Sequence, residues 1–255
     1  MSSFRARCPN CRTFTAVAVG TGYECHSCGS TFAAGLVRVP AAWGVGGEGM
    51  ADAARIPLPY PEVAVVERET LDEQSEAIAA SLPARPVVLG GCCCAHVGGA
   101  SEVAARVDRV AVVWIDAHGD LNTPESSPSG NLWGMPFRML LDRGVVRVED
   151  AALVGARNLD PPEAEFVERH GIDDSLDRAL AGADAVYVAL DLDVLDPSEV
   201  DVLIPEPDGP SAEEIEALLR GISGRATIAG MGVTGSLPTE RNAALTARML
   251  SAAGF

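Results

Sequence analysis

The sequence predicts an α/β protein in which a small metal-binding module precedes a doubly wound parallel sheet. Short apolar runs rich in Val, Leu and Ile alternate with helical patterns over most of the 255 residues. This alternation is typical of parallel strands that are buried on both faces and joined by helices. Two CxxC pairs precede the alternation. We therefore expect a cysteine-rich module over residues 1–35 and an α/β domain over residues 36–255.

The composition is strongly acidic, and this excludes several classes of partner. The chain has 36 acidic and 19 basic residues, which gives a formal net charge of −17. Such a charge argues against nucleic acid or an anionic membrane surface as a partner. No apolar run reaches the roughly 18 residues of a membrane span, and the N-terminus lacks the apolar core of a signal peptide. We expect a cytoplasmic protein.

The N-terminal module contains four cysteines in two CxxC pairs that are thirteen residues apart. This spacing suits tetrahedral binding of one structural Zn²⁺ by thiolates. The ligands would be Cys8, Cys11, Cys25 and Cys28. Residues 13–19 and 31–34 are predicted as short β segments, as in a zinc ribbon, and metal binding would supply much of the folding free energy of so short a segment. A pair of redox dithiols is the alternative.

The α/β domain is predicted to contain seven strands, with helices between them whose first residues are recognisable. Thr70 and Ser211 are each followed three residues later by Glu, which is the pattern of a capping box. Asp160 followed by Pro161 is an N-cap with proline at the first helical position. The strands are expected at residues 36–39, 63–66, 87–89, 110–115, 152–154, 186–190 and 227–229.

Two of these strands end in acidic clusters, at the edge of the sheet where ligands of α/β proteins bind. The side chains concerned are Asp116, His118 and Asp120 after one strand and Asp191 and Asp193 after another. Alternate residues share a face of a strand, so each group can converge. Four carboxylates would repel one another unless divalent cations join them, and oxygen ligands with one imidazole suit Mn²⁺. Taken alone, the second pair also fits a Mg²⁺ site or a helix cap.

These two motifs resemble those of the arginase/agmatinase (ureohydrolase) family. Residues 116–120 read DAHGD and residues 191–197 read DLDVLDP, and both match the family's signatures in the same order. The resemblance implies a three-layer α/β/α sandwich, two divalent ions, and a homo-oligomer that is a trimer or a hexamer. It also implies bridging by Asp116 and Asp191, and catalytic roles for Asp120 and His118. The metal ligands it implies are Cys93, Asp116, His118, Asp120, Asp191 and Asp193.

The segment after the first motif resembles arginase more than agmatinase. By that similarity, Asn122, Ser129 and Asn131 hold the α-carboxylate of an amino acid, and Asp160 meets its α-amino group. The substrate would then be a small molecule of the α-amino acid class. Ordinary turn chemistry is the alternative, because Asn, Ser and Asp favour loops.

The sequence departs from the family pattern at three positions. Cys93 stands where the family has a histidine ligand. A thiolate ligand favours Zn²⁺ or Fe²⁺ over Mn²⁺. Cys93 could instead be a buried thiol that binds no metal, with His96 as a substitute ligand. Trp133 replaces a histidine that would carry protons, and tryptophan cannot do so at neutral pH. Gly235 stands where the family has a glutamate that faces the guanidinium, and residues 230–238 contain no acid.

We therefore expect a metal-dependent hydrolase rather than an ordinary arginase. It would cleave a C–N bond in a guanidino- or amidino-type side chain of an α-amino acid. Its cofactors would be two divalent ions and one structural Zn²⁺. Mn²⁺ is the expected ion of the two-metal centre, and Zn²⁺ or Fe²⁺ is the alternative because of Cys93. The alternative is a catalytically lapsed arginase-like protein with a binding or regulatory role. Redox or metal sensing by the three cysteines at residues 92–94 is a third hypothesis.

Overall fold

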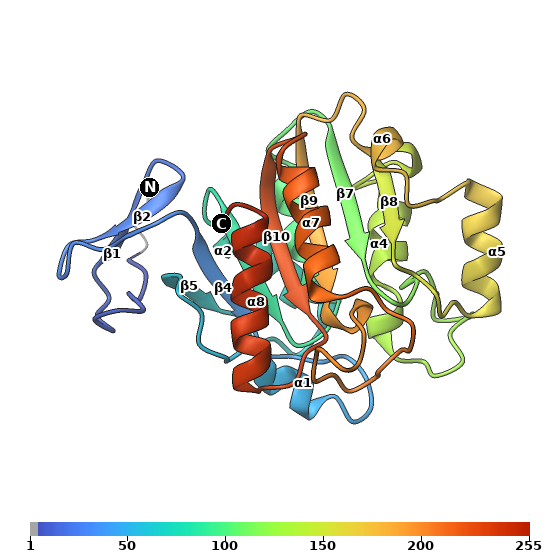
Figure 1. The fold of residues 1–255 in the computed structure, drawn as a ribbon, viewed down its shortest axis with the longest axis horizontal. Helices are drawn as coiled ribbons and strands as arrows, with labels where there is room; N and C mark the ends of the chain where they lie inside the picture. The colour runs from blue at the N-terminus through green and yellow to red at the C-terminus, as the bar shows by residue number, and fades with distance from the viewer. Residues whose placement is uncertain (1–4) are drawn as a thin grey trace.

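The computed structural model describes residues 5–255, which form one small sheet and one large sheet (Figure 1). The small sheet is antiparallel and contains β1 (Ala16–Val19), β2 (Gly22–Cys25) and β3 (Thr31–Phe32) in that order. It lies within the cysteine-rich module, of which residues 1–4 lie outside the described part. The small N-terminal β module that was predicted is therefore present.

The large sheet has seven strands, and every neighbouring pair is parallel. Their order is β5-β4-β6-β10-β9-β7-β8. All seven predicted strands occur. The strands are β4 (Gly35–Val39), β5 (Glu62–Val65), β6 (Pro86–Gly90), β7 (Val110–Ile115), β8 (Ala151–Val154), β9 (Ala185–Asp191) and β10 (Ile228–Thr234).

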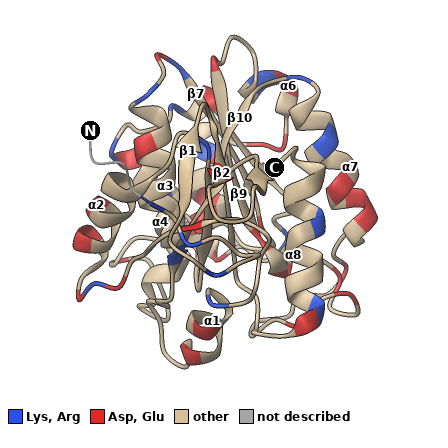
Figure 2. Ribbon diagram, turned by 90° about the vertical axis from the view of Figure 1, so that its left-hand side faces the viewer, with Lys and Arg blue, Asp and Glu red and all other residues tan. Residues whose placement is uncertain are grey.

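Helices cover both faces of this sheet, so the three-layer α/β/α sandwich is confirmed (Figure 2). On one face lie α2 (Leu71–Ser81), α3 (Ala95–Ala104) and α4 (Pro136–Asp142), and on the other α7 (Ala212–Ser223) and α8 (Glu240–Ala252). The remaining helices are α1 (Glu48–Ala53), α5 (Pro161–His170) and α6 (Leu176–Ala179), and short 3-10 turns lie at η1 (Leu132–Gly134), η2 (Val148–Asp150) and η3 (Leu192–Val194). No described helix is both long and apolar enough to cross a membrane.

The predicted helix starts are also present. The Thr70 hydroxyl accepts a hydrogen bond from the Glu73 amide at the start of α2. Ser211 forms a complete capping box at the start of α7, and at the start of α5 the Glu163 carboxylate accepts a hydrogen bond from the Asp160 amide. Caps of this kind satisfy amide groups that a helix leaves unpaired at its first turn.

The N-terminal module joins the large sheet at the edge strand β5. Arg7 and Glu62 exchange two backbone hydrogen bonds, with N···O distances of 2.8 and 2.9 Å, in an antiparallel bridge. Figure 1 shows the module, in blue, beside β5 and β4 at that end of the sheet. The module thus continues the sheet by one short pairing.

Candidate metal centre

The alternation of side chains along two central strands decides where the acids point. In β9, Val186, Val188 and Leu190 belong to the apolar core under α7 and α8, whereas Tyr187 and Ala189 belong to the core under α3 and α4. Asp191 continues the second row by two residues. The same alternation in β7 puts Asp116 in the row of Trp114, on the α3 side. Both carboxylates therefore emerge on the same side, at the carboxyl ends of paired strands.

Two groups of potential ligands meet there, and they share Asp116. One contains Cys93, Asp116 and Asp120, and the other contains Asp116, His118 and Asp193; within each group the ligand atoms lie within 4.8 Å of one another. The Cys93 Sγ lies 2.9 Å from Asp191 Oδ2, and His118 Nδ1 lies 3.1 Å from Asp193 Oδ2. The structure thus brings together all six residues that the resemblance implied as metal ligands.

The carboxylates are buried close to one another, and burial and mutual repulsion raise the pKa values of Asp191 and Asp193. Burial, together with the charge of neighbouring carboxylates, raises the pKa of Asp191 to about 7 and that of Asp193 to about 6. Burial by itself would lower the pKa of His118, but hydrogen bonds to Asp116 and Asp193 raise it to about 12. Burial also raises the pKa of the Cys93 thiol well above its usual range, with Asp191 adding to the effect. A divalent cation bound among these groups would offset the repulsion between the carboxylates and the free-energy cost of burying their charge.

The geometry of Asp120 also fits a bound cation. Its carboxylate is buried, and among residues 5–255 its Oδ2 atom has no hydrogen-bond partner. Its φ of 51° lies in the left-handed region, which is unusual for a residue other than glycine. Buried polar atoms are nearly always paired, so an unpaired carboxylate oxygen beside Cys93 and Asp116 fits a divalent cation.

Further side chains, which the sequence analysis missed, hold these residues in place. Glu206 Oε1 lies 3.3 Å from His118 Nε2 and accepts a hydrogen bond from Asn158 Nδ2 at 2.7 Å. The Trp114 indole donates to Asp116 Oδ2 at 3.2 Å. Glu206 comes from an irregular loop, so neither spacing nor periodicity in the sequence could have located it. Arg157 fixes that loop by donating to the carbonyl groups of Glu206 and Pro207.

A cavity of about 150 Å³ leads from these acids to the predicted substrate residues. Asn122, Ser129 and Asp160 line it, and the Asn122 amide donates to Asp160 Oδ2 at 2.8 Å. Asn131 is absent from the lining, and its Oδ1 accepts instead from the Val45 amide at 3.1 Å. Three of the four predicted substrate residues thus face the same cavity as the metal centre.

The structure also places the positions that depart from the family pattern. Trp133 lines the cavity, and its ring packs against Gly44 and Gly47. Gly235 has a φ of 77°, and a Cβ there would overlap the Asp191 carboxylate. No acidic side chain could occupy position 235 without displacing Asp191.

His96 takes no part in either ligand group. It lies in α3, and its two ring nitrogens face Thr234 Oγ1 at 3.1 Å and the Tyr187 hydroxyl at 3.2 Å. Its alternative role as a substitute ligand therefore has no support in the geometry.

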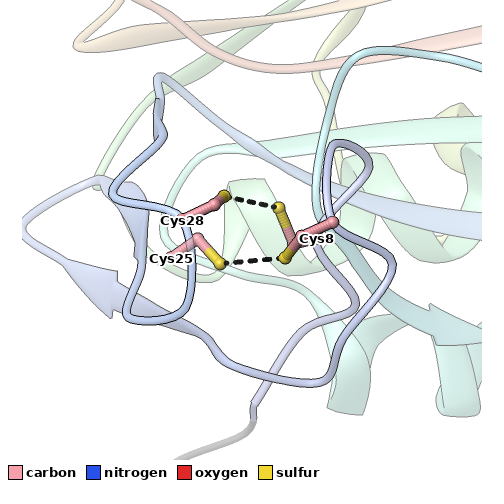
Figure 3. Close-up of side chains that lie close together, drawn as sticks. Cys8, Cys25 and Cys28 are labelled. Atoms are coloured by element: carbon pink, nitrogen blue, oxygen red, sulfur yellow. Dashed lines mark hydrogen bonds between the residues drawn. The ribbon is translucent and has the colours of Figure 1, made fainter.

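In the N-terminal module, the four predicted zinc ligands form a third cluster (Figure 3). The Sγ atoms of Cys8 and Cys28 are 3.8 Å apart, and those of Cys11 and Cys25 are 3.5 Å apart. Tetrahedral zinc–sulfur bonds of about 2.3 Å place sulfur atoms about 3.8 Å apart. A hydrogen bond with Thr15 lowers the pKa of Cys25 to about 6, which favours a thiolate. The cluster is consistent with a zinc-binding motif.

Comparison with known proteins decides the family. Residues 45–253 match the model of the Arginase family. The chain belongs to the arginase family. The arginase of Staphylococcus aureus strain COL is 36% identical over 142 residues, which cover 45% of this chain and 47% of that protein. The chain therefore spans about half the length of the curated arginases it matches.

Solved structures of family members share the fold. The arginase of Bacillus subtilis superposes with a TM-score of 0.75 at 23% identity and covers 86% of this chain and 96% of its own. The formimidoylglutamase of the same species gives a TM-score of 0.71 at 18% identity, over 86% and 85%. At these identities the likeness establishes the arginase fold alone.

Proposed function

We propose that this arginase-family chain is a metal-dependent hydrolase that cleaves a C–N bond in a guanidino- or amidino-type side chain of an α-amino acid. One observation carries the proposal: two ligand groups that share Asp116 lie in the same cavity as Asn122, Ser129 and Asp160. The two ligand groups suit a pair of divalent cations. The other three residues suit the charged end of an amino acid.

Cys93, Asp116, His118, Asp120, Asp191 and Asp193 would hold the ions. Two divalent ions supply an acidified water and polarise the group to be cleaved. With one thiolate among oxygen ligands, the centre would accept Zn²⁺ or Fe²⁺ beside Mn²⁺.

The remaining side chains would bind and orient the substrate. The Asp160 carboxylate would pair with an ammonium group, and the Asn122 amide and Ser129 hydroxyl would bind a carboxylate. Glu206 would hold His118 in one orientation, as carboxylates commonly do for metal-binding histidines. Trp133 gives the cavity an apolar wall that cannot transfer protons, which separates this site from an ordinary arginase.

The first experiment is metal analysis by plasma mass spectrometry, on protein expressed with manganese and zinc. We expect one zinc and about two further divalent ions per chain. The metal-loaded protein is then tested for release of urea or ammonia from α-amino acids with guanidino, amidino and formimino side chains.

Asp193→Ala should lose turnover and the divalent ion that Asp116, His118 and Asp193 would hold. Asp208→Asn, which changes an exposed acid of the loop that carries Glu206, should lose neither. If Asp193→Ala left metal content and turnover unchanged, the proposal would fail.

A second candidate function is ligand binding without catalysis. It is favoured by Trp133 in the cavity wall and by the absence of any acid from residues 230–238. Calorimetric binding of an α-amino acid, with no metal-dependent release of urea or ammonia, would support it. Turnover of any compound in the panel would remove it.

We also propose that Cys8, Cys11, Cys25 and Cys28 hold a structural Zn²⁺ and that residues 1–35 form the module around it. Chelation should then unfold the module, which near-ultraviolet circular dichroism of Tyr23 can follow.

A further inference from the structure

A row of three buried polar side chains lies directly behind Cys93. The Tyr187 hydroxyl is 3.2 Å from His96 Nδ1, and His96 Nε2 is 3.1 Å from Thr234 Oγ1. Thr234 Oγ1 in turn lies 3.2 Å from Cys93 Sγ and 3.1 Å from Asp191 Oδ2. The row therefore begins in the core between the sheet and α3 and ends at two of the proposed metal ligands.

The fold leaves room for this row. The His96 ring packs against Gly232, where a side chain would overlap it, and it meets the Trp114 ring edge to face at 5.1 Å. Alternation along β10 puts Thr234 on the same face as Gly232, so its hydroxyl points at both His96 and Cys93. His96 and Tyr187 are fully buried, and water does not compete for their hydrogen bonds.

The hydrogen bonds in this row can run in only one direction if every buried donor is to be satisfied. A neutral imidazole carries one N–H and accepts a hydrogen bond at its other nitrogen, whereas a charged one donates from both. In the part of the chain that the structure describes, His96 is the hydrogen-bond partner of the Tyr187 hydroxyl. Tyr187 must then donate to Nδ1, since otherwise its proton would have no acceptor.

The rest of the row follows from that assignment. The His96 proton sits on Nε2 and is donated to Thr234 Oγ1. The Thr234 proton is then free for an acceptor on the other side, and Cys93 Sγ and Asp191 Oδ2 are the near ones. The Leu190 carbonyl, at 3.5 Å, is the longest of its contacts.

We propose that Tyr187, His96 and Thr234 act as positioning residues that hold the Thr234 hydroxyl against the Cys93–Asp191 pair and so fix both side chains in place as ligands of the metal centre. This inference rests on the proposed function, in which Cys93 binds metal. A hydrogen bond to a thiolate spreads its negative charge, and it does so here without adding a cation that would repel the bound metals.

The test uses the full-length protein with zinc in the N-terminal module and Co²⁺ in the metal centre. Thiolate-to-Co²⁺ charge transfer absorbs in the near ultraviolet, and the part that disappears in Cys93→Ser reports on Cys93 alone. Thr234→Val removes the hydroxyl at nearly constant volume, and Thr234→Ser retains it. Tyr187→Phe removes the far end of the row.

Thr246→Val is the matched control. It makes the same chemical change at a buried hydroxyl that has no hydrogen-bond partner among the described residues and lies in α8, on the other face of the sheet. Thermal unfolding of each variant checks that it is folded before its spectrum is compared.

We expect Thr234→Val to move the Cys93 band to longer wavelength and to weaken Co²⁺ binding by about 10- to 100-fold, the effect usual for groups that support metal ligands. Tyr187→Phe should move both in the same direction by less, and Thr234→Ser and Thr246→Val should leave both unchanged. A Cys93 band that Thr234→Val does not move overturns the positioning role but leaves Cys93 as a ligand. A wild-type protein with no Cys93-dependent band overturns the ligand assignment itself.

Discussion

At the scale of single residues, Cys93 is the proposed ligand that would decide which metals the centre prefers. It lies among carboxylates, with its Sγ 2.9 Å from Asp191 Oδ2 and 3.6 Å from Asp116 Oδ2. The other residues proposed as ligands offer oxygen or imidazole nitrogen, which suit Mn²⁺, whereas a thiolate is softer. The sequence alone left open whether Cys93 was a ligand or a buried thiol, and its place in a ligand group favours the first.

Replacing Cys93 by serine should therefore change the order of metal affinities. We expect Cys93→Ser to weaken Zn²⁺ binding by at least about tenfold, or about 1.4 kcal/mol, and to weaken Mn²⁺ binding less. Competition with a fluorescent chelator measures both affinities. Cys94→Ser changes a neighbouring buried cysteine outside the ligand group and should alter neither. Equal losses for both metals would contradict a thiolate ligand.

Glu206 supports a second prediction at this scale. Its carboxylate meets His118 Nε2, the ring nitrogen opposite the one that faces Asp116 and Asp193. Glu206→Gln should weaken metal binding about tenfold or more, because a carboxylate orients a metal-bound imidazole and makes it a better donor. Glu213→Gln, an exposed acid in the first turn of α7, serves as the control. Unchanged affinity in Glu206→Gln would mean that the loop only closes the cavity.

At the scale of elements, strand β10 shows where sequence reasoning succeeded and where it stopped. The strand was predicted to end at residue 229, whereas it continues to Thr234. Gly230 and Gly232 interrupt the apolar pattern, and glycine is a poor strand former. The strand forms nevertheless because it lies between β6 and β9 in the centre of the sheet.

The same comparison explains the site. Asp116 and Asp191 could be predicted because each directly follows an apolar strand, so that periodicity and sheet topology decide their position. Thr234 was missed because its strand was predicted to be too short. Glu206 and Asn158 were missed because they reach the site from loops, whose course no periodic pattern encodes.

The close contact between Gly235, just after β10, and Asp191 gives a prediction for substitution of this glycine. Gly235→Ala would add a methyl group that overlaps Asp191, besides the roughly 1–2 kcal/mol that a left-handed backbone costs any other residue. We expect loss of bound metal and a loss of stability larger than that range, measured by metal analysis and urea unfolding. Gly171→Ala introduces the same backbone strain at φ 65° with no atom nearby, and it should lower stability by the backbone cost alone. Equal effects at both positions would show that Asp191 tolerates the added group.

At the scale of the whole molecule, the buried acids link metal binding to the pH dependence of folding. In the metal-free protein the pKa of Asp191 is raised from 3.8 to about 7, and that of Asp193 to about 6. Between pH 3.8 and about 7 the folded state then binds more protons than the unfolded state. The stability of the folded state therefore falls as pH rises through that range. His118, with a pKa raised from 6.5 to about 12, acts in the same direction above pH 6.5.

We therefore expect metal-free protein to lose stability on the order of 3 kcal/mol between pH 4 and pH 7 from Asp191. Urea unfolding at several pH values, with and without added metal, measures this. Asp191→Asn should flatten the dependence, because an amide does not titrate. A metal-free protein that grows more stable over the same range would contradict the raised pKa values.

The backbone bridge between Arg7 and Glu62 has a consequence for behaviour in concentrated solution. β5 is the last strand at its side of the sheet, and such strands offer unpaired amide and carbonyl groups to other chains. The module shields part of that border, and its fold depends on the proposed zinc. Loss of the proposed zinc would thus leave the acidic cluster at the other strand ends in place and yet expose β5, so that two chains could associate by strand pairing. Aggregation on storage would then appear before any change at the proposed active site.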